Sequence, residues 1–104
     1  MVHVIATIEV VPGRRPDFLA EFHRIVPAVR AEAGCLEYGP TVDVSTAIAA
    51  QIALRENAVT IVEKWESLPA LLDHLKAPHM TEYRLRVKEM VVKTSLQVLQ
   101  PADG

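Results

Sequence analysis

The stretch Glu63-Lys-Trp-Glu-Ser-Leu-Pro-Ala-Leu-Leu-Asp-His-Leu-Lys-Ala-Pro-His-Met80 decides the fold, because the hydrophobic pattern changes its period there. Residues 59–62, just before it, form a β-branched run that is typical of a strand. Within the stretch, leucines recur at the three- and four-residue spacing of an amphipathic helix. A strand is therefore predicted to deliver Glu63 and Trp65 to one place, and the helical turns that follow bring histidines near it.

Working outward from this stretch, alternation and helical spacing predict the remaining elements. Strands are expected at 2–11, 35–44, 59–66 and 93–99, and helices from 16 to just before 34, at 68–75 and from 78 onward. The segment 45–57 fits neither period, and we expect a long hairpin excursion with a short strand at 51–54. The even-numbered residues of the first strand form a wholly apolar face, which matches the apolar stripe of the first helix.

The order β-α-β-β-α-β predicts an α+β fold of the ferredoxin-like, split βαβ type with an antiparallel sheet. In this pattern the helices cover one face of the sheet and leave the other open. We expect the open face to carry Ile5, Val59 or Ile61, and Trp65, a surface too apolar for water. Two chains are therefore predicted to pack as a homodimer. Residues 1–100 are expected to form a single domain, followed by a short tail at 101–104.

Composition argues against several classes of function. A formal net charge of −2 gives no electrostatic basis for binding nucleic acid. The basic residues at 84, 86 and 88 are interrupted by acidic ones and are predicted to form one solvated helix face. Cys35 is the only cysteine, so an intrachain disulfide is impossible. No signal-peptide pattern and no apolar run of about 20 residues is present, so a cytoplasmic location without membrane insertion is expected.

Four short motifs in this order carry a family resemblance. They are Pro12-Gly13, Gly34-Cys35-Leu36-Glu37-Tyr38, Glu63-Lys64-Trp65-Glu66-Ser67 and His74-Leu75-Lys76-Ala77-Pro78-His79-Met80. Together they resemble the antibiotic biosynthesis monooxygenase (ABM) family over nearly the whole chain. The Leu99-Gln100-Pro101 ending is similar to that of its bacterial quinol monooxygenase branch.

The resemblance implies a ferredoxin-like, dimeric α/β barrel. It also implies cofactor-independent oxygenation of hydroxylated aromatics such as quinols, with no flavin, haem or metal. Relatives in the same family degrade haem or isomerise small phosphorylated sugars. The haem-degrading relatives use an asparagine in the third strand, where this chain has Ile61, so the resemblance implies a quinol more than a haem.

Glu63 and Trp65 are two residues apart, so on a strand they share a face. A flat indole beside a carboxylate suits an aromatic diol, because the ring can stack and the carboxylate can accept a phenolic hydrogen bond or proton. The alternative is that Trp65 fills a dimer core and Glu63 pairs with a basic residue.

His74 and His79 are five residues apart across Pro78, which is not the i, i+4 spacing of a metal-binding helix face. No metal site is therefore predicted. His74 is the favoured general base, because a neutral imidazole can take a phenolic proton near neutral pH; the alternative is that it braces the short helix. Tyr38, His79, His3 and Ile61 are the remaining candidates for contact with the substrate.

Three hypotheses about function follow. The first is a cofactor-independent monooxygenase that oxidises a quinol or similar polyhydroxylated aromatic with molecular oxygen. The second is an isomerase of a small phosphorylated carbonyl compound, in which His74 and Glu63 move a proton without oxygen. The third is a dimer that binds an aromatic ligand without catalysis.

Overall fold

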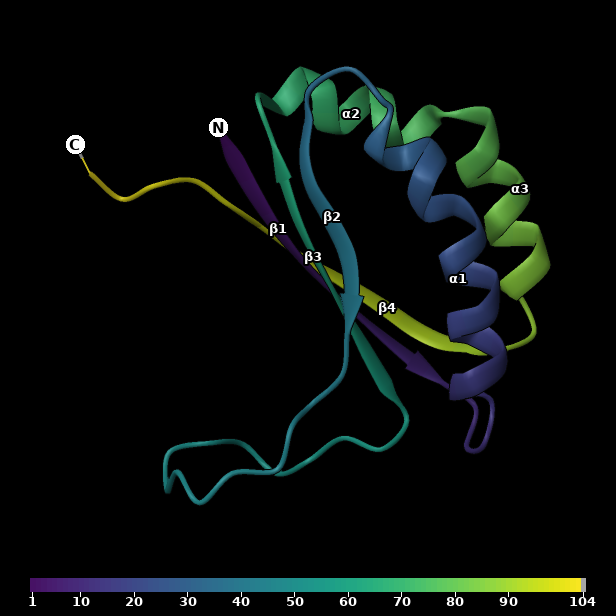
Figure 1. The fold of residues 1–104 in the computed structure, drawn as a ribbon, viewed down its shortest axis with the longest axis vertical. Coiled ribbons are helices and arrows are strands. Elements are labelled where there is room, and N and C mark those ends of the chain that lie inside the picture. Colours follow the sequence, from purple (N-terminus) through teal and green to yellow (C-terminus); the bar gives the residue numbers. More distant parts are fainter. Residues whose placement is uncertain (104) are drawn as a thin grey trace.

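The computed structural model describes residues 1–103, and Gly104 lies outside them. Seven elements follow one another along the chain (Figure 1). They are β1 (Val2–Val10), α1 (Arg15–Arg30), β2 (Cys35–Thr41), β3 (Ala58–Trp65), α2 (Leu68–Lys76), α3 (Pro78–Val87) and β4 (Val91–Leu99). Among the described residues, no helix is both long and apolar enough to cross a membrane.

The sheet has four strands in the order β2-β3-β1-β4, and every neighbouring pair is antiparallel. All the helices lie on one side of it, with α1 and α3 side by side (Figure 1). This arrangement confirms the predicted α+β, ferredoxin-like fold. Both β2 and β4 are edge strands, as Pro40 in β2 had led us to expect for that strand.

The core lies between the sheet and the helices. In β1 the even-numbered residues from Val4 to Val10 are buried, as predicted, and they face Phe18, Phe22 and the other apolar residues of α1. In β3 the odd-numbered residues pair with them, because Glu63 lies opposite Val4. The helices therefore cover the face of the sheet that carries Glu63.

The prediction that Trp65, with Val59 or Ile61, lies on the open face is wrong. All three are buried on the helix-covered face, and Trp65 is fully buried within one chain. The register leaves a mixed set of side chains on the open face, in which polar residues predominate. They include His3, Ile5, Thr7, Glu9, Thr60, Val62, Lys64, Ser95 and Gln97. The open face is therefore less apolar than predicted.

The segment 42–57 contains no helix or strand, so the short strand expected at 51–54 does not form. It projects from the end of the sheet away from the helices (Figure 1). An ion pair between Arg55 and Asp43, with Nη2 and Oδ1 2.9 Å apart, ties its two ends together. Residues 100–103 follow β4 without a helix or strand, and the predicted tail ends in the undescribed Gly104.

Candidate active site

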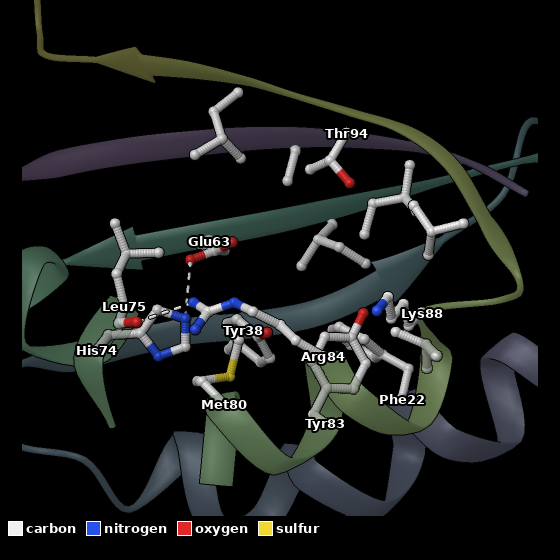
Figure 2. A pocket seen from close by; sticks show the side chains of 16 residues that line it. Phe22, Tyr38, Glu63, His74, Leu75, Met80, Tyr83, Arg84, Lys88 and Thr94 are labelled. Carbon is white, nitrogen blue, oxygen red and sulfur yellow. Dashed lines mark hydrogen bonds and ion pairs between the residues drawn. The ribbon is translucent and has the colours of Figure 1, made fainter. Parts of the chain in front are cut away.

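A cavity of about 490 Å³ lies between the sheet and helices α2 and α3. Most of its wall is apolar, and a few polar groups converge on it, which is typical of a small-molecule site. Figure 2 shows Glu63 and His74 near one end, with Lys88 and Thr94 toward the other. The apolar wall includes Ala6, Ile8, Phe22, Ile61, Leu75, Met80 and Leu96.

Glu63 is a carboxyl group buried on the covered face of β3, with 6% of its surface exposed. The indole Nε1 of Trp65 donates a hydrogen bond to its Oε1 at 2.9 Å. Burial raises the pKa of Glu63 to about 7, although the bond from Trp65 opposes the shift and the charge of Glu32 adds to it. Near neutral pH this carboxyl group can therefore either hold or accept a proton.

His74 lies on α2 with only 2% of its side chain exposed. Its ring packs on Trp65, with the ring centroids 4.6 Å apart, and meets the ring of Tyr38 edge-on. Its Nδ1 is 2.9 Å from Oε2 of Glu32, and its Nε2 is 4.0 Å from Oε1 of Glu63. Burial lowers the pKa of His74, against the opposing effect of Glu32, which favours the neutral imidazole.

The tautomer of His74 follows from its partner. A Glu32 carboxylate can only accept hydrogen bonds, so Nδ1 of His74 carries the ring proton. Nε2 then presents a lone pair toward Glu63 and the cavity. This is the form in which an imidazole acts as a general base.

A break between α2 and α3 brings His79 to the same carboxylate. Ala77 is extended, with ψ 140°, because the ring of Pro78 disfavours a helical conformation in the residue before it. The chain therefore changes direction between the two histidines, and Nε2 of His79 lies 2.7 Å from Oε2 of Glu32. The two histidines therefore share a carboxylate. Among the described residues, no group of three or more His, Cys, Asp or Glu side chains is placed so that it could hold a metal ion.

The structure brings together four of the seven predicted site residues. Glu63, His74, Tyr38 and Ile61 line the cavity, as Figure 2 shows for the first three. Burial raises the pKa of Tyr38, so its hydroxyl group stays protonated and able to donate. Trp65, His79 and His3 do not line the cavity.

Each of these three residues lies outside the cavity for a different reason. Trp65 is buried behind Glu63 and His74. It donates a hydrogen bond to Glu63 and packs against the ring of His74, instead of offering a free surface on which a substrate could stack. His79 contacts Glu32 outside the cavity. His3 lies on the open face of the sheet, where its position in β1 is opposite Lys64 of β3.

Sequence reasoning missed three residues around the cavity. Glu32 follows α1 and lies 42 residues before His74, so no local period links the two. Arg84 on α3 and Lys88 just after it are exposed, as predicted for a solvated helix face, yet both also line the cavity. Their spacing of four residues, which places them on one side of a helix, was the available signal.

Comparison of the sequence with known proteins finds a matching family model and a relative similar over nearly its whole length. The family model described as "Antibiotic biosynthesis monooxygenase" matches residues 1–86. A relative from Escherichia coli K12, named "Probable quinol monooxygenase YgiN", is 38% identical over 103 residues, covering 97% of this chain and 98% of the relative.

Solved structures share the fold. Rv0793 from Mycobacterium tuberculosis superposes with a TM-score of 0.78 at 28% identity, covering 99% of this chain and 96% of that one. PA3566 from Pseudomonas aeruginosa gives a TM-score of 0.79 at 24% identity, covering 98% and 94%. The second likeness concerns the fold alone.

Proposed function

This chain belongs to the antibiotic biosynthesis monooxygenase family, and from that premise we propose that it is a cofactor-independent monooxygenase of quinols or similar polyhydroxylated aromatics. One observation carries the proposal: a buried carboxyl–imidazole pair, Glu63 and His74, borders an apolar cavity of a size suited to a small molecule. The name of the Escherichia coli relative points to the same class of substrate.

The spacing of the pair suits a hydroxyl group. Nε2 of His74 and Oε1 of Glu63 are 4.0 Å apart, too far for a direct hydrogen bond. An oxygen atom placed off the line between them can lie about 2.8 Å from both, which is a normal hydrogen-bond distance. A phenolic hydroxyl there can give its proton to His74 while Glu63 fixes its position.

The chemistry that follows needs no external reductant. Loss of the phenolic proton leaves an electron-rich quinolate, which can give one electron and then a second to molecular oxygen. A quinol supplies two electrons and two protons, enough for one oxygen atom to leave as water while the other enters the ring to give a hydroxylated quinone. Arg84 and Lys88 place positive charge beside the cavity, which favours the quinolate.

Other side chains have supporting roles in this proposal. Trp65 positions Glu63 through its hydrogen bond and His74 through ring packing. Tyr38 can donate a hydrogen bond to a second oxygen of the substrate, and Ile61 provides apolar wall for the ring. His79 acts from outside the cavity, and His3 has no contact with it.

We also propose that the working unit is a homodimer. β4 is an edge strand, and Leu96 and Val98 remain about half exposed on the helix side of the sheet because no helix reaches them. Leu96 also borders the cavity. Exposed Ile48 and Ile52 in the segment 42–57 add further apolar surface. A second copy that covers β4 would bury Leu96 and Val98 and complete the cavity wall.

Sedimentation tests the dimer. The wild-type protein at micromolar concentration should sediment with twice the mass of one chain. Leu96→Asp should shift it toward the monomer by burying a charge at the interface. A monomeric wild type, or a dimer that Leu96→Asp and Val98→Asp together leave intact, would contradict this interface.

Oxygen uptake tests the proposed reaction. With a naphthohydroquinone in air, the wild type should consume oxygen faster than the autoxidation blank. His74→Ala should lower the excess rate by about 100-fold or more, the usual contribution of a positioned base. His23→Ala is the matched control, since it removes an exposed histidine of α1. Equal rates in the wild type and the blank, or in His74→Ala and the wild type, would refute the proposal.

A further inference from the structure

Four side chains lie in a row from the cavity to the surface. Glu63 borders the cavity, His74 follows 4.0 Å away, and Glu32 accepts contacts from His74 at 2.9 Å and from His79 at 2.7 Å. From His74 outward, side-chain exposure rises from 2% to 15% at Glu32 and 29% at His79. The inner end is buried, and the outer end reaches water.

We propose that Glu32 and His79 form a proton relay that connects the general base His74 with solvent. The inference rests on the proposed function, because it gives the relay the proton of a substrate hydroxyl to carry. It adds two residues that do not touch the cavity and that the oxygenase chemistry alone does not require. Both are positioning and proton-transfer groups, not contacts of the substrate.

The proton steps balance. The substrate O–H bond breaks and an N–H bond forms at Nε2 of His74, while the proton on Nδ1 passes to Oε2 of Glu32. When His79 carries protons on both ring nitrogens, its Nδ1 releases one to water as Glu32 takes up the proton from His74, while Nε2 of His79 keeps its hydrogen bond to Glu32. The line runs in reverse when reduced oxygen takes up protons to form water, and this restores the starting tautomers. No charge accumulates in the apolar cavity, where it would be costly.

The fold fixes Glu32 in this position. Glu32 lies in the turn between α1 and β2, and its backbone N–H donates to the carbonyl of Val29 at 2.9 Å. Two residues later, Gly34 adopts φ +84° and passes so close to α2 that an added Cβ would lie 2.7 Å from the Cβ of Ala70. The turn therefore packs against the helix that carries His74.

The surrounding charges do not offer a competing route. Arg84 donates from Nη2 to the carbonyl of Leu75 at 2.8 Å, and Arg30 donates from Nε to the carbonyl of Tyr38 at 3.0 Å. Neither guanidinium can accept a proton. Burial raises the pKa of the Cys35 thiol, as do the charges of Glu32 and Glu63, so this thiol stays protonated as well. Burial also raises the pKa of Tyr83 on the cavity wall, so its hydroxyl group stays protonated.

The substitution Glu32→Gln distinguishes a role of Glu32 in proton transfer from a purely structural role. The glutamine keeps an oxygen that can accept from Nδ1 of His74, but an amide cannot take up a proton near neutral pH. We expect kcat for quinol oxidation to fall about 100-fold, with the anaerobic binding constant for the quinol and the midpoint of urea unfolding unchanged. His23→Ala is the control and should leave all three unchanged.

His79→Ala supplies a second and independent readout. Free imidazole in the buffer should restore its rate in proportion to the imidazole concentration, because a small base can replace the missing outer group. A residue that only supports the fold would show no such dependence. Restoration by an equal concentration of a non-basic salt would also overturn the relay.

The outcomes distinguish this inference from the function beneath it. If the wild type does not exceed the autoxidation blank, the proposed function fails and the relay with it. If the wild type is active, and both Glu32→Gln and His79→Ala keep kcat within about threefold of it, the function stands and the relay is wrong. A fall in kcat without rescue by imidazole would assign Glu32 and His79 a structural role and also overturn the relay.

Discussion

Glu63→Gln should make the protein more stable, and increasingly so as the pH rises. The wild-type carboxyl group is buried, and its pKa in the folded chain is about 7, against 4.5 for the exposed group. Below pH 4.5 the group is protonated in both the folded and unfolded states and costs nothing. Between pH 4.5 and 7 the unfolded chain ionises first, so the wild type loses stability until the folded group ionises too. A glutamine has no such dependence and keeps an oxygen that can accept from Trp65.

The size of this stability gain follows from the raised pKa of Glu63. A rise from 4.5 to about 7 corresponds to about 3 kcal/mol, at about 1.4 kcal/mol for each pH unit. The difference in unfolding free energy between Glu63→Gln and the wild type should therefore grow by about 3 kcal/mol from pH 4.5 to pH 8. The lowered pKa of His74 affects both proteins and largely cancels in the difference.

Urea unfolding followed by circular dichroism at several pH values measures this difference. Glu82→Gln is the matched control, because it removes an exposed carboxyl group from α3, and its difference from the wild type should stay flat. Parallel stability curves for Glu63→Gln and the wild type across this pH range would refute the reasoning, since they would mean that burial does not disfavour the ionised carboxylate. The same substitution should slow quinol oxidation.

Three further predictions concern the turn, the cavity and the base. Gly34→Ala should lower the unfolding free energy by about 1–3 kcal/mol, because it forces a side chain into a positive φ and against Ala70; a melting temperature equal to that of the wild type would contradict this. Lys88→Ala should raise KM for an ionised quinol by about two- to fivefold, the range for an exposed charge, and an unchanged KM would exclude a contact with the substrate. In Glu63→Gln, which lacks the neighbouring carboxyl group of pKa about 7, the acid limb of the kcat/KM profile should lie below pH 6.5, because burial lowers the pKa of His74; a limb well above it would exclude neutral His74 as the base.

The fold was accessible from the sequence because local patterns determine most of it. The alternation in β1, the N-cap Ser67 and the prolines at the starts of α2 and α3 place those elements within a few residues of their observed bounds. The sequence also predicts that Glu63 and Trp65 share a face. It does not reveal whether the helices cover that face or the opposite one. Thr60 and Val62 on the opposite face suit a covered position as well as Ile61 does, and a carboxylate such as that of Glu63 is expected in contact with water.

The site was only partly accessible for a related reason. His74 was recognised by its chemistry, but its partner Glu32 comes from a turn 42 residues earlier. Periodicity describes neighbours within one element, and only packing brings a turn, two helices and a strand to one carboxylate. The spacing of His74 and His79 argued against a shared metal ion, but could not show that the break at Ala77 gives them a shared carboxylate instead.

The position of a bound quinol tests the central claim most directly. A crystal grown and soaked without oxygen, with a naphthohydroquinone, should show the ring in the cavity between the sheet and α3. One hydroxyl oxygen should lie within hydrogen-bond distance of both Nε2 of His74 and Glu63. A ring bound on the open face of the sheet, or one in the cavity with both hydroxyl groups directed away from this pair, would contradict the account.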